Sequence, residues 1–264
     1  MLLFTRPTAT LPVSLTGPAC ALNCAHCGGR YLAHMRPVQQ ADATGYRSLL
    51  ISGGCDPHGR VPITNEIDTV RSLRAGRRLN WHVGFARETE LARIAPLVDV
   101  ISFDIVGDSD TAREVYGLEL SLADYLQQLC QLERVAPVVP HLTLGLRGGR
   151  ISGEEQALQA LAKRDTRRLI LLILIPTAGT RYAQVEPPPL GEVARLFALA
   201  RQLLPRAHID LGCMRPHGRY RQQVDCLAIE ANLDGIVNPT RDAEQLAVKL
   251  GRTIQWGNEC CALL

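Results

Sequence analysis

Apolar and polar positions follow two alternating periods along the chain. Runs of apolar residues, many with every second position polar, predict eight β-strands, at residues 11–16, 48–52, 79–85, 98–105, 138–146, 168–175, 208–212 and 235–237. Between them, apolar residues at three- and four-residue steps predict eight helices, at residues 66–75, 88–94, 110–116, 122–134, 153–163, 190–203, 221–231 and 242–250. Strands alternating with helices are typical of a parallel sheet with crossover helices. We therefore predict an α/β fold, a parallel β/α barrel of the TIM type, full or partly open.

Length and charge agree with a single domain of this kind. The chain has 264 residues, and a β/α barrel typically needs about 250. We expect residues 1–250 to form the barrel and residues 251–264 to form a cysteine-bearing tail that packs at the barrel mouth. The formal net charge is only +3 and the basic residues are scattered. The sequence therefore predicts no nucleic-acid partner.

Cysteine usage and hydropathy bear on the compartment. The nine cysteines are an odd number, and the N-terminal residues do not read as a signal peptide. Disulfides are rare in reducing compartments, so a thiol-rich chain with closely spaced cysteines favours the cytoplasm and a metal centre. The longest apolar run, residues 169–176, is far shorter than the roughly 20 residues of a membrane-spanning helix. We expect no membrane contact.

Three cysteines lie close together in the loop after the first predicted strand. Cys20, Cys24 and Cys27 are separated by steps of four and three residues. Thiolates this close either share a disulfide or bind a soft metal centre. A zinc site normally has a fourth Cys or His nearby, but the only candidate, His26, lies inside the second step and is too cramped to close a tetrahedron. Three thiolates on a 4Fe–4S cluster leave one iron without a protein ligand.

This cysteine loop resembles the signature of the radical S-adenosylmethionine (SAM) enzymes. The resemblance implies a 4Fe–4S cluster on Cys20, Cys24 and Cys27 whose open iron binds the amino and carboxylate groups of SAM. Reduction then splits SAM into methionine and a 5′-deoxyadenosyl radical, which removes a hydrogen atom from the substrate. The family usually has an aromatic residue at the position of His26, so this chain departs from the pattern there.

A Gly-Gly pair follows the second predicted strand. Gly53 and Gly54 precede Cys55, and glycines let backbone approach a ligand closely. This segment resembles the Gly-Gly-x element of radical SAM enzymes. In those enzymes the element commonly ends in Glu, and its backbone contacts the SAM amino group. The resemblance implies that Gly53 and Gly54 bind SAM. Cys55 stands where Glu is common, which is a second departure.

Polar residues share one face of several predicted strands. A barrel interior is usually filled by branched aliphatic side chains, so a polar lumen indicates a cavity that holds a ligand. Each residue alone reads equally well as a hydrogen-bonded core residue. We take Asp104 as the best candidate for a contact with ribose or substrate. The inward-facing set is Asn80, His82, Ser102, Asp104, His141, Thr143, His208 and Asp210.

Two later loops resemble segments of biotin-synthase-like radical SAM proteins. Residues 144–155 are glycine-rich and include Arg147, and in those relatives the segment lies near the adenosine. Ser152 followed by Glu155 is equally consistent with a helix-capping role. Residues 175–180 form a turn that in the relatives helps to hold SAM or substrate, which implies such a role for Pro176 and Thr177.

Four other cysteines suggest a second iron–sulfur cluster. Cys55 and Cys213 both follow predicted strands, and Cys260 and Cys261 lie in the tail. Soft thiolates at the mouth of a barrel favour such a cluster. Arg215 is expected nearby as an unusual ligand or a charge partner, as an arginine is in biotin synthase. We therefore predict catalytic roles for Cys55, Cys213 and Arg215. The alternative is a reactive pair of terminal thiols and two buried ones.

A sulfide-bridged second cluster implies sulfur transfer. Residues 212–216, residues 234–240 and the Glu-Cys-Cys tail look most like the archaeal-type lipoyl synthases, which act as a pair of related radical SAM proteins. The resemblance implies sulfur insertion into an octanoyl chain on a lipoyl-carrier protein. It also implies a sister radical SAM subunit and an electron donor such as ferredoxin or flavodoxin.

Two alternatives remain open at the level of sequence. Without a second cluster, the chain resembles a single-cluster mutase or isomerase such as methylornithine synthase, with a small amino acid in the polar lumen. The other alternative is a non-catalytic iron–sulfur or metal-binding protein.

Overall fold

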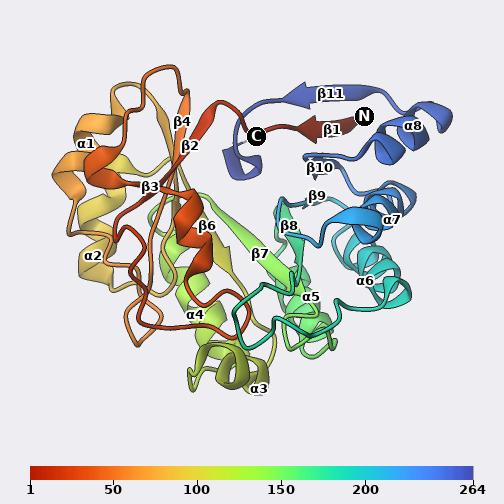
Figure 1. Ribbon diagram of the computed structural model, residues 1–264, viewed down its shortest axis with the longest axis horizontal. Helices are drawn as coiled ribbons and strands as arrows, with labels where there is room; N and C mark the ends of the chain where they lie inside the picture. Colours follow the sequence, from red (N-terminus) through yellow and green to blue (C-terminus); the bar gives the residue numbers. More distant parts are fainter. Residues whose placement is uncertain (264) are drawn as a thin grey trace.

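The computed structural model describes residues 1–263, and these form one curled sheet with helices on its outer side (Figure 1). Eleven strands are described, every neighbouring pair is parallel, and the order is β11-β1-β10-β9-β8-β7-β6-β5-β4-β2-β3. The sheet has two free edges, so it is a partly open barrel. The predicted fold class is confirmed.

All eight predicted strands are present, several with shorter carboxyl ends than expected. Three short strands, β1, β3 and β11, were not predicted. The strands are β1 (Leu2–Thr5), β2 (Thr10–Ser14), β3 (Arg36–Pro37), β4 (Ser48–Ser52), β5 (Arg78–His82), β6 (Val100–Asp104), β7 (Val138–Leu144), β8 (Arg168–Ile173), β9 (His208–Leu211), β10 (Gly235–Val237) and β11 (Ile254–Gly257).

The eight predicted helices are also present, at the outer face of the sheet (Figure 1). The third one begins as α3 and continues as a π-helical turn at Ala112–Tyr116. None of the helices in residues 1–263 has the length and hydropathy to cross a membrane. The helices are α1 (Ile67–Arg74), α2 (Glu88–Ile94), α3 (Ser109–Thr111), α4 (Leu122–Glu133), α5 (Glu154–Lys163), α6 (Leu190–Leu203), α7 (Gly218–Glu230) and α8 (Arg241–Lys249).

Helix α4 illustrates why these segments are helical and where their faces point. Ser121 and Asp124 form a reciprocal capping box at its start, which satisfies two backbone N–H groups that the helix leaves unpaired. Tyr125, Leu129 and Leu132 then fall on one buried face. Fully burying an apolar side chain of this size stabilises the fold by about 1.5–3 kcal/mol.

The two faces of the sheet bury different kinds of residue. The large core lies between strands and helices and includes Trp81, Phe103 and Phe197. A smaller apolar cluster lies inside the barrel, where Val100, Val139 and Ile170 pack with Val237 and with the tail residues 261–263. The interior of the barrel therefore has an apolar floor beside the tail.

The first strand lies one place in from an edge of the sheet, which β11 forms. Strand β1 lies between β10 and β11, with Leu3 opposite Gly235 and Phe4 opposite Trp256. Strand β2, the next in sequence, lies near the opposite edge. The opening between the two edges is bridged by hydrogen bonds from the backbone N–H of Ala9 to the Asn258 carbonyl, at 2.8 Å, and from the Cys260 N–H to Thr10 Oγ1, at 2.7 Å.

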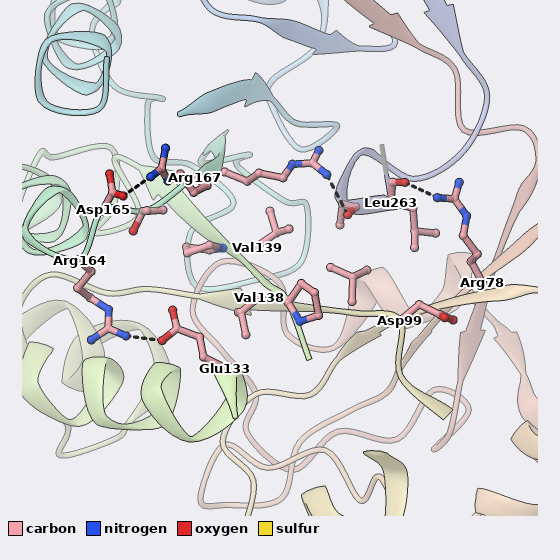
Figure 2. Close-up of a pocket in the computed structure, with 15 residues that line it drawn as sticks. Arg78, Asp99, Glu133, Val138, Val139, Arg164, Asp165, Arg167 and Leu263 are labelled. Carbon is pink, nitrogen blue, oxygen red and sulfur yellow. Dashed lines mark hydrogen bonds and ion pairs between the residues drawn. The ribbon is translucent and has the colours of Figure 1, made fainter. Parts of the chain in front are cut away.

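The expectation that the tail packs at the barrel mouth is not met. Arg78 and Arg168 are the first residues of β5 and β8, so they mark the amino end of the barrel. Arg78 donates to the Leu263 carbonyl at 2.7 Å (Figure 2), and Arg168 donates to the Cys261 carbonyl at 2.6 Å. The tail is a plug at the end opposite the mouth, because these guanidinium groups bind its carbonyls. Leu264, the last residue of the expected tail, lies outside the described residues.

Candidate functional site

The three thiols of the cysteine loop line one cavity of about 220 Å³ at the carboxyl ends of the strands. The loop is held by its backbone: Ala25 N–H donates to the Val115 carbonyl at 2.7 Å, and Tyr182 N–H donates to the Ala25 carbonyl at 3.0 Å. These bonds connect it to the π-helical turn and to the loop after β8. Cys20, Cys24 and Cys27 therefore come together in a fixed backbone frame, as the sequence predicts.

The thiols influence one another strongly. A hydrogen bond from Cys24 and the neighbouring His26 lower the pKa of Cys27 to about 4, although burial opposes this shift. The same hydrogen bond and burial raise the pKa of Cys24. One thiol of the pair is thus a thiolate at neutral pH, and thiolates are the form that binds metal.

His26 is enclosed by two aromatic rings. Its ring makes edge-to-face contacts with Tyr31, at 6.2 Å between centroids, and with Tyr116, at 5.7 Å. Its Nδ1 atom is buried and has no hydrogen-bond partner among the described residues. A buried donor or acceptor left alone costs about 1–3 kcal/mol, so this atom faces a site built for a group that the polypeptide does not supply. Three thiols and an unpartnered imidazole nitrogen around one cavity fit an iron–sulfur cluster.

The Gly-Gly pair is packed directly against the cysteine loop. A Cβ on Gly54 would lie 1.9 Å from the Ala19 carbonyl oxygen and 2.7 Å from Cys20 Cα. Gly54 N–H donates to Thr16 Oγ1 at 2.7 Å. Gly53 and Gly54 also line the cavity of the three thiols. Close approach of two backbones is what glycine permits, and here it fixes the position of Cys20.

Cys55 belongs to this first site. Its N–H donates to Cys20 Sγ at 3.4 Å, and its carbonyl accepts from Ala21 N–H at 2.8 Å. Burial, followed by the charge of Cys20, raises the pKa of Cys55 to about 12. The structure therefore places Cys55 beside the cysteine triplet, whereas the sequence interpretation assigned it to a second cluster.

A second cavity of about 140 Å³ continues into the barrel lumen. It shares His82 and Asp104 with the first cavity and has an apolar wall that includes Leu172 and Met214. Met214 is held there by its carbonyl, which accepts from Ile173 N–H at 2.9 Å. The predicted polar lumen is therefore present, but it faces an apolar wall on the side of β8.

Two histidines and an aspartate form the polar wall. His82 Nε2 lies 3.0 Å from Asp104 Oδ2, and the His82 and His141 rings stack at 5.7 Å between centroids. Burial opposes the charged form of Asp104, but the charge and hydrogen bond of His82 lower its pKa to about 2. Burial likewise lowers the pKa of His82, and Asp104 outweighs it, so the net shift is upward. Burial and the charge of His82 lower the pKa of His141 to about 4.

The other thiols divide between the lumen and its apolar floor. Cys260 Sγ accepts from Asn80 Nδ2 at 3.3 Å, and hydrogen bonds from Cys261 and Asn80 contribute to lowering its pKa to about 6. Cys213 keeps an exposed surface. Surrounding protein and the nearby Cys260 raise the pKa of Cys213. Cys261 is buried among Val100 and its apolar neighbours.

Arg215 does not face the lumen as a ligand would. Its side chain is 0% exposed, and so is that of Asp225. Arg215 Nε donates to Asp225 Oδ1 at 2.6 Å, and Nη2 donates to Oδ2 at 3.1 Å. Nη1 donates to the Gly212 carbonyl at 2.6 Å, and Nη2 also to the Asn238 carbonyl at 3.2 Å. The expected ligand role is not met, because all three nitrogens are used in a buried ion pair that anchors the loop after β9.

The remaining predicted residues lie around the mouth. Tyr31 OH and Thr177 Oγ1 are hydrogen-bonded at 2.9 Å, which ties the cysteine loop to the loop after β8. Pro176 lies between Thr177 and Ile175, and Ile175 lines the lumen cavity. Arg147 Nε donates to Glu114 Oε2 at 2.7 Å, and Arg147 lines neither cavity of the site. The sequence did not identify Tyr31 and Tyr116 as residues of the site. Their only sequence signal is that Tyr31 lies near the cysteine loop and Tyr116 lies near Asp104.

Among residues 1–263, no group of three or more His, Cys, Asp or Glu side chains is arranged to hold a single metal ion. A cavity of about 500 Å³ lies at the amino end of the barrel beside the tail. Its rim is ion-paired, with Arg164 on Glu133 and Arg167 on Asp165 (Figure 2).

Comparison with known proteins gives relatives of low identity. No protein-family model matches the chain. The chain is 26% identical to biotin synthase from Halorhodospira halophila, over 96% of this chain and 85% of that protein. Among solved structures it resembles methylornithine synthase, with a TM-score of 0.62 at 12% identity over 95% of this chain and 84% of that one. It also resembles the FeFe-hydrogenase maturase HydG from Carboxydothermus hydrogenoformans, with a TM-score of 0.65 at 15% identity over 96% and 67%.

These matches agree with the cysteine loop. The similarity to biotin synthase agrees with the resemblance of the cysteine loop to the radical SAM superfamily. The structural likenesses show the fold. The subtype within the superfamily depends on the chain's own residues.

Proposed function

We propose that this protein is a radical SAM enzyme that inserts sulfur into an octanoyl chain carried by a lipoyl-carrier protein. The observation that carries this proposal is a pair of further thiols: Cys260 Sγ accepts from Asn80 Nδ2 at 3.3 Å, and Cys260 is close enough to Cys213 to raise its pKa. A simple mutase has no need of thiols on the far side of its substrate cavity.

The first site would be held by Cys20, Cys24 and Cys27. When bound, the cluster and SAM supply a 5′-deoxyadenosyl radical, and a second cluster supplies sulfur. Gly54 keeps Cys20 close to the backbone of the Gly-Gly loop. Tyr31 and Thr177 hold the cysteine loop against the loop after β8. These contacts fix the cofactor side of the cavity relative to the lumen.

The lumen offers a suitable place for an acyl chain. Leu172, Ile175 and Met214 form an apolar wall, and His82 with Asp104 forms a polar wall opposite the carbon to be modified. Each new carbon–sulfur bond replaces one C–H bond, with the hydrogen leaving as part of 5′-deoxyadenosine and the remaining electron passing to iron.

Partners are proposed on the same basis. The proposed substrate is an octanoylated carrier protein or peptide, and the proposed electron donor is a ferredoxin or flavodoxin. A sister radical SAM subunit takes part in the same overall reaction. We place the protein in the cytoplasm, since nine cysteines, all free, are typical of a reducing compartment.

The test separates SAM cleavage from sulfur transfer. After anaerobic reconstitution, iron and acid-labile sulfide are counted on the wild type and on a Cys20/Cys24/Cys27→Ala variant. Roughly four irons should be lost in the variant while a second set remains. Cys24→Ala should abolish SAM cleavage, whereas Cys213→Ala should cleave SAM and form no thiolated product. Product formation by Cys213→Ala at the wild-type rate contradicts the sulfur-transfer proposal.

One observation favours a second candidate. The chain shares the fold of methylornithine synthase, and the His82–Asp104 pair presents a carboxylate to the lumen, which would suit the ammonium group of a small amino acid. For this mutase reaction, the triple variant should lose all of its iron.

A further inference from the structure

A hollow in the surface borders the cysteine loop and shares a wall with the first cavity. The hollow has a volume of about 490 Å³ and is lined by residues 17–18, before the first cysteine, and residues 32–37, after the third. Leu32 lines both this hollow and the cavity of the three thiols. A molecule seated in the hollow would therefore be separated from the thiol cavity by a wall that includes Leu32.

The segment that forms most of this hollow continues directly from the cysteine loop. The N–H of Arg30 donates to the Cys27 carbonyl at 2.8 Å, at the start of the short 3₁₀ helix Arg30–His34. The N–H of Leu32 then donates to the Gly29 carbonyl at 3.2 Å. These backbone hydrogen bonds hold the hollow and the thiol cavity at a fixed separation.

The lining of the hollow combines apolar side chains with an arginine and contains no acidic residue. Leu32 and Met35 are half-buried there, whereas His34 and Arg36 are exposed. Residues 1–41 include no Asp or Glu at all. Apolar side chains accompanied by arginine are typical of the surfaces where two proteins meet. The hollow therefore suits a protein partner.

The charge of this surface is positive and is not neutralised by neighbouring carboxylates. Among residues 1–263, Arg36 forms no ion pair. Arg30 donates to the Gly179 carbonyl, a neutral acceptor, at 3.1 Å. Its guanidinium occupies the space beside Gly179, where a Cβ would lie 2.2 Å from Nη2. Both arginines keep their charge beside the cysteine loop, and because complementary charge steers partners together, the expected partner is acidic.

We infer that this hollow is the docking site for an acidic electron-donor protein that supplies the first site with electrons. The inference rests on the proposed function and gives its electron donor a place on the surface. One electron leaves the donor and is consumed when a carbon–sulfur bond of SAM is broken, so the step needs no other reductant. The lipoyl-carrier protein fits the hollow less well, because none of the described residues that line the hollow also lines the lumen cavity, where the octanoyl chain would react.

Binding measured without turnover tests the docking site. The full-length protein, reconstituted with iron and sulfide, is titrated anaerobically with an oxidised acidic flavodoxin and, separately, with an oxidised acidic ferredoxin. Arg36→Glu should weaken binding severalfold at low ionic strength, and the difference should shrink in high salt because exposed charges are screened. Arg241→Glu is the matched control, since it makes the same change of charge at the start of α8 and should bind like the wild type. Wild-type protein that binds neither donor overturns the inference, and so does Arg36→Glu protein that binds as tightly as the control.

A comparison of two reductants separates this inference from the proposed function. With dithionite, Arg36→Glu should cleave SAM at the wild-type rate, because a small reductant needs no docking site. With the donor protein below saturation, cleavage by Arg36→Glu should be severalfold slower, and cleavage by Arg241→Glu should be unchanged. An equal loss with both reductants overturns the docking role and leaves the radical SAM activity standing. Wild-type protein that cleaves no SAM with dithionite overturns the proposed function itself, and the electron-donor role with it.

Discussion

Replacing Arg215 by methionine separates a structural role from a ligand role. The substitution keeps most of the volume and removes the charge. The Asp225 carboxylate is then left fully buried, with the Thr240 N–H donating to it at 2.9 Å. Breaking a buried ion pair by removing one member costs about 3–5 kcal/mol. For a chain of this size, each kcal/mol lowers the melting temperature by about 2–4 °C, so the loss is on the order of 6–20 °C.

Anaerobic urea unfolding of the protein without iron measures this loss directly. Arg221→Met is the matched control, because Arg221 donates to the same Asn238 carbonyl, at 2.9 Å, from a more exposed position, and its loss should cost under about 1 kcal/mol. The double variant Arg215→Met/Asp225→Leu should recover most of the stability, since it removes both charges together. An Arg215→Met protein of unchanged stability but altered cluster spectrum would refute the structural role and restore Arg215 as a ligand.

Three further predictions concern the loop, a buried acid and the tail. Gly54→Ala should lose the first cluster, because its Cβ would overlap the backbone at 1.9 Å, whereas Gly191→Ala, with nothing within 4 Å, should bind iron normally. Burial raises the pKa of Glu154 to about 7 from its ordinary 4.5. The folded state therefore holds this proton more tightly than the unfolded chain does. As the pH rises from 4.5 to 7, the free energy of unfolding should fall by on the order of 3 kcal/mol. Glu154→Gln should flatten this pH dependence in unfolding curves. Arg78→Ala removes a tail hydrogen bond and should speed alkylation of the tail thiols severalfold, as measured by mass spectrometry, whereas the exposed Arg167→Ala should not.

The strands and the cysteine loop could be predicted from the sequence because their signals are local. Residues 168–173 form a strand whose apolar run is largely buried. The steps between Cys20, Cys24 and Cys27 indicate an iron–sulfur site by themselves. The polar lumen followed from alternation along single strands, and His82 and Asp104 indeed meet across two of them.

What the sequence could not reveal depends on contacts between distant segments. The tail position follows from arginines at the amino ends of two strands, and nothing in the tail itself indicates them. Cys55 and Cys213 both follow strands, but the backbone contacts of Cys55 place it beside Cys20, whereas Cys213 keeps an exposed surface. The partner of Arg215 lies ten residues on, in α7, and its identity depends on how that helix packs.

The pairing of β1 with β10 and β11 sets an order of assembly. Leu2–Thr5 are synthesised before the other strands of the sheet, yet their sheet partners β10 and β11 are synthesised after all the others. Each of the strands β2 to β9 pairs with a neighbour close in sequence, so these pairings can form earlier. Pairings between distant segments form slowly. The cysteine loop and the lumen are therefore shaped while the amino end of the barrel is still open. For the second cluster proposed above, the topology favours loading through that end before the tail arrives.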